Sequence, residues 1–165
     1  MTRILGIDLG ERRIGLALAD GDGSAARPLR TIRRGRTLED DATVLAPIVA
    51  AGEVAELVVG LPLEASGERG PQAELSETWA AELAAILQLP FTMRDERLSS
   101  HLAEQRLGPM KRGRSGGPPT PSQREAYRAR VDREAAAIIL QDELDSRPAV
   151  RYASPARSQR TETSP

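Results

Sequence analysis

The sequence lacks cysteine altogether and contains a single histidine, His101, among its 165 residues. The absence of cysteine excludes disulfide scaffolds, thiol nucleophiles and cysteine-ligated zinc or iron–sulfur sites. Aromatic residues make up only 2% of the chain, so base stacking is not expected to dominate any contact with nucleic acid. No apolar run approaches the roughly 20 residues of a membrane helix, and the first residues do not resemble a signal peptide. A cytoplasmic protein without membrane contact is therefore expected.

The charge is nearly balanced overall but unevenly distributed. The formal net charge is −1, and Lys111 is the only lysine among 23 basic residues. Arginine and alanine enrichment by itself also follows from GC-rich coding. Within residues 106–133, however, only Glu125 and Asp132 oppose a cluster of basic side chains, and such a local excess indicates a nucleic-acid surface. The cluster consists of Arg106, Lys111, Arg112, Arg114, Arg124, Arg128, Arg130 and Arg133.

The first third of the chain predicts three antiparallel strands. Residues 3–9 and 14–20 are two apolar runs whose short connection leaves no room for a crossover helix, so they are expected to pair as a hairpin. In the second run large residues alternate with glycine and alanine, which predicts one bulky face and one close-packed face. Residues 29–33 predict a third strand, and its arginines are typical of a protected sheet edge.

The rest of the chain shows helical periods alternating with short apolar runs. The resulting order β-β-β-α-β-α-β-α predicts an α/β fold, with a five-stranded mixed sheet and helices on both faces. Thr37 and Ser122 are the expected caps of the first and last helices. Strands are expected at 56–60 and 91–95, and helices at 38–51, 71–87, 99–107 and 122–144.

The domain organisation follows from composition. Residues 1–146 are expected to form one domain, which fits the length of the chain. Residues 108–122 are rich in glycine, proline and basic side chains and predict a flexible basic loop. Residues 147–165 contain mainly serine, proline, arginine and threonine, and predict a disordered tail.

Two aspartates occupy positions where a carboxylate needs an explanation. Asp8 lies in an apolar strand, where a charge is costly unless it is paired, protonated or bound to metal. An ion pair with Arg12 or Arg13 is the alternative to a functional role. Asp132 lies at the start of a helix face that must pack on the sheet. Its alternatives are a favourable interaction with the helix dipole and a salt bridge to Arg128.

A third carboxylate, Glu96, follows the carboxyl end of the fifth strand, where open α/β sheets bind ligands. The alternative is a polar strand exit in which Arg97 neutralises the acids. Together with Asp8 and Asp132, Glu96 would form an oxygen-ligand set that suits Mg²⁺ or Mn²⁺ better than zinc, with Asp95 as a candidate fourth ligand. Bound cations would relieve the repulsion among these acids, activate a water and stabilise a leaving oxygen.

Several further residues are expected to contact substrate phosphates. The glycine-containing loop before residue 71 leads into a helix, whose free amides attract phosphate and whose glycines permit close approach. The basic loop would hold the nucleic-acid backbone by charge, although a merely solvated loop is the alternative. The predicted substrate-binding residues are Arg13, Gly60, Arg69, Gln72, Arg97, Lys111, Arg112, Arg114 and Arg128.

Four segments resemble a known family. They are Ile4–Gly10 with Arg13–Gly15, Val58–Leu63 with Gly70–Ala73, Asp95–Ser99, and Val131–Asp132 with Ala135–Gln141. In their order and spacing the chain resembles the YqgF-type family, whose members are described as pre-16S ribosomal RNA nucleases and as Holliday-junction-resolvase-like proteins. The resemblance implies an RNase H-like fold and a metal-dependent nuclease with Asp8, Glu96 and Asp132 at its acidic positions. It also implies trimming of the 5′ end of the small-subunit ribosomal RNA precursor.

Four functions are compatible with these features. The leading one is a phosphodiesterase with Mg²⁺ or Mn²⁺ as cofactor, acting on RNA in preference to DNA as a monomer or weak homodimer. A Holliday-junction resolvase would use the same metal site but would need a two-fold dimer to cut opposed strands. A non-catalytic RNA-binding module would not need the three acids. An actin-like ATPase is disfavoured because the chain is too short for two such domains.

Overall fold

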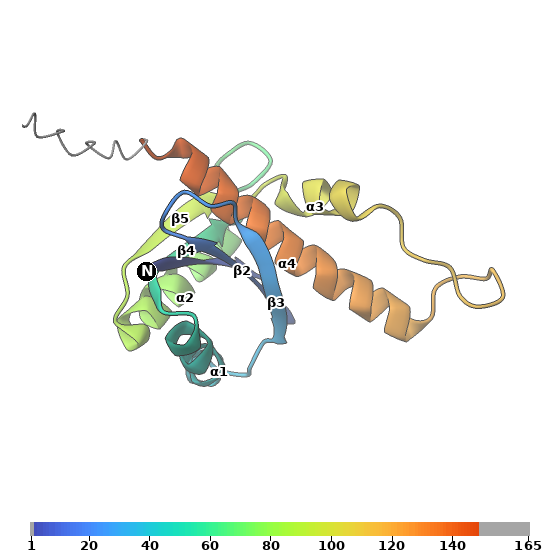
Figure 1. The fold of residues 1–165 in the computed structure, drawn as a ribbon, viewed down its shortest axis with the longest axis horizontal. Coiled ribbons are helices and arrows are strands. Elements are labelled where there is room, and N and C mark those ends of the chain that lie inside the picture. The colour runs from blue at the N-terminus through green and yellow to red at the C-terminus, as the bar shows by residue number, and fades with distance from the viewer. Residues whose placement is uncertain (1, 149–165) are drawn as a thin grey trace, which may run out of the picture.

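The computed structural model describes residues 2–148 as a five-stranded sheet with helices on both faces (Figure 1). The strand order is β3-β2-β1-β4-β5; β1, β2 and β3 are antiparallel, and β4 and β5 run parallel to β1. The strands are β1 Arg3–Leu9, β2 Arg13–Asp20, β3 Arg27–Arg33, β4 Val54–Leu61 and β5 Phe91–Asp95. The helices are α1 Leu38–Ala51, α2 Pro71–Leu87, α3 Ser99–Leu107 and α4 Pro121–Ser146. The predicted α/β arrangement, a five-stranded mixed sheet with helices on both faces, is confirmed.

The two faces of the sheet carry different side chains. Large apolar residues of β1 and β2, such as Leu5 and Leu16, are fully buried in the core that α1 and α2 cover. The opposite face carries Ala17 and Ala19 and packs against α4. The predicted division into a bulky face and a close-packed face is therefore correct. Within the described part of the chain, no helix is both long and apolar enough to cross a membrane.

Glycines on the second face allow the backbone of α4 to pack directly against the strands. A Cβ at Gly15 would lie 2.0 Å from the backbone oxygen of Asp132, and one at Gly6 would lie 2.7 Å from Cβ of Leu140. The Thr31 hydroxyl of β3 also donates a hydrogen bond to the Ala129 carbonyl at 2.5 Å. Such close packing leaves α4 little freedom to shift, so it fixes where the helix carries Asp132 above the sheet.

The helix caps confirm one prediction and correct another. Thr37 caps α1, and its side chain accepts from the Asp40 N–H at 3.2 Å while Asp40 reciprocates. The last helix begins earlier than predicted: Thr120, not Ser122, is the cap, and it forms a capping box with Gln123. Proline fits the first helical position because its missing N–H would lack a partner there. The basic loop between α3 and α4 therefore ends at residue 120.

The carboxyl end of α4 is tied back to the sheet. Arg147 directly follows the helix and forms ion pairs with Glu56 of β4 and with Glu143 one turn earlier. The predicted tail at 147–165 lies outside the described residues from position 149 onward. Other boundaries shift by two residues: β3 begins at Arg27 and β4 at Val54, ahead of their predicted starts.

Candidate active site

Three elements bring the predicted acids to the face of the sheet that α4 covers. Asp8 lies near the end of β1, Glu96 follows β5, and Asp132 lies in α4. The carboxyl groups of Asp8 and Glu96 are in hydrogen-bonding contact, and the charge of Asp132 acts on Asp8. Gly60 of β4 makes room for this group, because a Cβ there would lie 2.0 Å from Glu96 Oε2.

Burial and mutual repulsion raise the proton affinity of the central pair. Burial, followed by the charge of Asp8, raises the pKa of Glu96 to about 9. Burial raises the pKa of Asp8 to about 6; the hydrogen bond with Glu96 opposes this increase, and the charge of Asp132 adds to it. Two carboxylates in contact cannot both remain charged without a cation. Burial and the charge of Asp8 therefore favour the protonated form of Glu96, which donates a hydrogen bond to Asp8.

The surroundings of the Asp8 and Glu96 carboxyl groups favour a bound cation. Glu96 Oε2 is buried and has no hydrogen-bond partner within the described chain. A buried acceptor without a partner is costly and calls for an explanation such as an ion or water. Carboxylate oxygens from three elements are the donor set that Mg²⁺ and Mn²⁺ prefer.

The third acid, Asp132, forms an ion pair with Arg13. Its Nε lies 2.5 Å from Asp132 Oδ2, and its Nη1 lies 3.4 Å from Glu125 Oε1. As the side chains stand, residues 2–148 contain no cluster of three or more His, Asp or Glu side chains arranged to hold a metal ion. The suggested pairs of Arg13 with Asp8 and of Arg128 with Asp132 do not form; instead, Arg13 pairs with Asp132.

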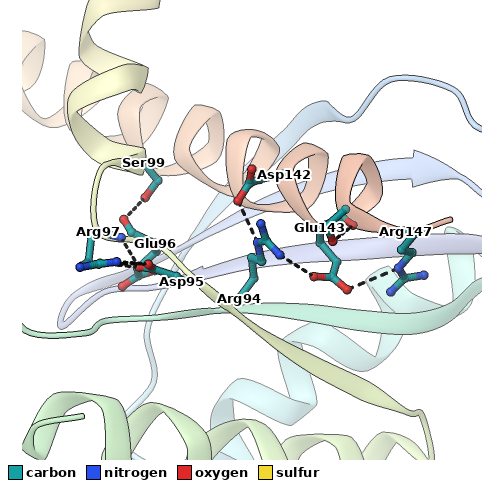
Figure 2. A network of polar contacts seen from close by, with 9 residues as sticks. Arg94, Asp95, Glu96, Arg97, Ser99, Asp142, Glu143 and Arg147 are labelled. Carbon is teal, nitrogen blue, oxygen red and sulfur yellow. Dashed lines mark hydrogen bonds and ion pairs between the residues drawn. The ribbon is translucent and has the colours of Figure 1, made fainter. Parts of the chain in front are cut away.

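Ion pairs hold the end of β5 against the carboxyl half of α4 (Figure 2). Arg94 Nε lies 2.8 Å from Asp142 Oδ2, and Arg94 Nη1 lies 3.6 Å from Glu143 Oε2. The Ser99 hydroxyl donates to the backbone carbonyl of Glu96 at 2.9 Å. These contacts fix the backbone of Glu96 on both sides, so its carboxyl group is directed by the fold.

Asp95 forms an ion pair with Arg97, two residues further along the chain. Arg97 Nη2 lies 2.8 Å from Asp95 Oδ2 (Figure 2), and this bond lowers the pKa of Asp95. Both side chains, together with Glu96, line a cavity of about 620 Å³ between the end of β5, α3 and α4. Leu98 and Ile138 supply part of its apolar wall. Glu96 is the one of the three acids that lines this cleft, which is large enough for part of a nucleotide chain.

The other predicted contacts do not line the cleft beside Glu96. Arg69 pairs with Glu77 of α2, and Gln72 lines a separate cavity of about 730 Å³. Arg128 is exposed on α4. The basic loop joins the amino end of α4, about three helical turns before Asp132 (Figure 1). It carries Lys111, Arg112 and Arg114.

Sequence reasoning missed two features. A buried aspartate, Asp41, accepts hydrogen bonds from Trp79 Nε1 at 3.1 Å and from the Gly35 N–H at 2.7 Å, which anchors α1 to α2. Arg12 and Arg33 line one cavity together with Arg13, whereas the sequence pattern of β3 predicts only a protected sheet edge. The repeated Arg-Arg pairs were the available signal for this second feature.

Comparison with known proteins identifies the family. A family model described as "RuvX: Holliday junction resolvase" matches residues 2–146. The chain belongs to the RuvX family. RuvX is another name for the YqgF-type family, so the match confirms the family expected from the four segments.

Its relatives match over nearly their whole length. A protein of Anaeromyxobacter sp. (strain Fw109-5), named "Putative pre-16S rRNA nuclease", is 46% identical over 145 residues, which cover 88% of this chain and 98% of the relative. A protein of the same name from Chloroflexus aurantiacus is 43% identical, with 87% of each chain covered. Among solved structures, T. thermophilus RuvC in complex with Holliday junction substrate is similar with a TM-score of 0.48 and 15% identity, over 87% of this chain and 94% of that chain.

Proposed function

We propose that this chain is a divalent-metal-dependent nuclease that hydrolyses phosphodiester bonds in nucleic acid. The observation that supports this most directly is the buried contact of Asp8 with Glu96, beside Asp132 and an open cleft. In this contact Glu96 Oε2 has no hydrogen-bond partner among residues 2–148. Membership of the RuvX family supports the nuclease activity. We further propose that residues 1–146 constitute the nuclease domain and that the protein acts in the cytoplasm.

Asp8, Glu96 and Asp132 would hold the cation. A bound Mg²⁺ or Mn²⁺ would supply an activated water and neutralise charge on the leaving oxygen. Its ligation would require Glu96 to lose its proton and Asp132 to exchange Arg13 for the metal. Arg97, at the mouth of the cleft, would orient a substrate phosphate, while Asp95 holds its guanidinium in place.

We propose pre-16S ribosomal RNA as the substrate, with cleavage at its 5′ end. The names of the relatives from Anaeromyxobacter and Chloroflexus support this choice. The basic loop between α3 and α4 would hold the RNA backbone by charge, and the protein would act as a monomer or weak homodimer. The description of the family as a Holliday junction resolvase favours a second candidate, resolution of branched DNA, which requires two active sites in a two-fold dimer.

The decisive experiment compares wild-type protein with Asp8→Asn on three substrates, with Mn²⁺, Mg²⁺ or chelator. The substrates are a precursor RNA carrying the 5′ leader, single-stranded DNA and a four-way DNA junction. Metal-dependent cutting of the RNA, lost in Asp8→Asn without loss of folding, is the expected result. Asp20→Asn is the matched control, because Asp20 pairs with Arg3 at the opposite end of the same hairpin.

Other outcomes would revise the proposal. Symmetric cutting of the junction alone would favour a resolvase. Binding of RNA without any cleavage would favour a non-catalytic module. Full activity in Asp8→Asn would refute the assignment of the acids.

A further inference from the structure

Four arginines meet where the β1–β2 turn lies beside the end of β3. Arg12 directly precedes β2, which begins at Arg13, and Arg34 directly follows β3, which ends at Arg33. Arg13 and Arg33 are directly opposite each other in the antiparallel ladder, and the Arg34 N–H donates to the Arg12 carbonyl at 2.9 Å. Like charges directly opposite each other on neighbouring strands destabilise a sheet. The fold therefore maintains a repulsive arrangement at this corner.

The four side chains line one cavity of about 440 Å³, together with Glu11 and Glu125. Two of the arginines already have partners. Arg13 pairs with Asp132 and Glu125, and Arg34 Nη1 donates to the Gly10 carbonyl at 3.1 Å.

Arg12 and Arg33 are different, because neither forms an ion pair with any residue in the range 2–148. Both are exposed at the mouth of the cavity. Their guanidinium groups can therefore meet a ligand without first breaking a bond. A planar guanidinium matches phosphate with two parallel hydrogen bonds, and several such groups around one hollow suit a tetrahedral anion.

We propose that this cavity binds one phosphate group of the substrate strand, next to the phosphate that the acids receive. Arg13 links the two places, because it lines the cavity and also contacts Asp132. The phosphate relieves the repulsion between Arg13 and Arg33 and fixes the register of the strand across the acids. The identification of this phosphate as part of a nucleic acid rests on the proposed function. The binding of phosphate by the cavity is independent of that function.

The first test measures the Tm of thermal unfolding with and without inorganic phosphate. Phosphate replaces chloride in the buffer so that the ionic strength stays constant. Phosphate is expected to raise the Tm of the wild-type protein and to leave the Tm of Arg33→Gln unchanged. Arg30→Gln is the matched control, since Arg30 is an exposed arginine of the same strand that does not line the cavity. Equal phosphate responses in all three proteins would overturn the proposal.

The second test measures binding of fluorescent single-stranded RNA in chelator over a range of salt concentrations. Arg33→Gln is expected to weaken binding roughly tenfold and to reduce the slope of log affinity against log salt by about 0.7, the value for one lost phosphate contact. RNAs with and without a 5′-phosphate distinguish the source. If Arg33→Gln weakens binding only of the 5′-phosphorylated RNA, the cavity binds the terminal phosphate. If it weakens binding of both RNAs equally, the cavity binds an internal phosphodiester.

The outcomes separate the two proposals. Phosphate stabilisation lost in Arg33→Gln, in a protein that cleaves nothing, would support the cavity and refute the nuclease. Cleavage and RNA binding unaffected by Arg33→Gln, with no phosphate effect, would leave the nuclease intact and overturn the cavity.

Discussion

Replacing Glu96 with glutamine is expected to stabilise the metal-free protein at alkaline pH while abolishing cleavage. Burial and the charge of Asp8 raise the pKa of Glu96 from 4.5 to about 9. A carboxyl group whose pKa is raised on folding keeps its proton in the folded state while the unfolded chain has lost it. The free energy of unfolding therefore falls as pH rises between these two pKa values. Glutamine keeps the shape and a donor for Asp8 but cannot ionise.

The magnitude follows from the width of that window. Each pH unit between the two pKa values costs up to about 1.4 kcal/mol of stability. Because Asp8 titrates together with Glu96 and water reaches the cleft, we expect a total of about 2 kcal/mol between pH 5 and pH 8, well below that limit. In a chain of this size such a change corresponds to about 4–8 °C in Tm.

The assay is thermal unfolding of both proteins in chelator at pH 5 and pH 8. The two proteins should unfold at similar temperatures at pH 5, and Glu96→Gln should unfold at the higher temperature at pH 8. Glu104→Gln on α3 is the matched control, because Glu104 is exposed and should show no such crossover. If Glu96→Gln lowers Tm by the same amount at both pH values, the reasoning about a buried, proton-holding pair is refuted.

Three further variants test the packing and the substrate surface. Gly15→Ala should cost about 3 kcal/mol or more in urea unfolding, because its Cβ would lie 2.0 Å from the Asp132 carbonyl oxygen and α4 would have to shift. Trp79→Phe should cost about 1–3 kcal/mol, because it leaves an oxygen of buried Asp41 without its donor. Removing the charges of the basic loop should weaken RNA binding mainly at low salt, with little change in Tm. The loop variant replaces Lys111, Arg112 and Arg114 with alanine.

Specific results would contradict each expectation. Unchanged stability of Gly15→Ala would show that α4 is not held at backbone distance, with Gly117→Ala as a control because a Cβ there meets only a Ser115 oxygen at 3.8 Å. For Trp79→Phe, an unchanged urea midpoint would mean that the hydrogen bond to Asp41 contributes nothing net. For the loop variant, an unchanged salt slope would exclude phosphate contacts there.

The local pattern of the chain was enough to predict the strands, their order along the chain and the division of β2 into a bulky face and a close-packed face. Alternation of Gly15, Ala17 and Ala19 with large residues has one physical meaning in a strand, which is close packing on one face. Asp8 could be singled out because a carboxylate in an apolar strand is costly. The first helix cap was also readable, since a capping box needs only residues three positions apart.

The pairing of charges was decided only in three dimensions. Asp132 had several arginines within reach in the sequence, yet its partner is Arg13, 119 residues away, because close packing of α4 on β2 sets the two side chains against each other. The contact of Asp8 with Glu96 similarly depends on the parallel pairing of β1, β4 and β5, and on the space left by Gly60. Electrostatic energy depends on the distance between charges in space, and that distance does not follow from their separation along the chain.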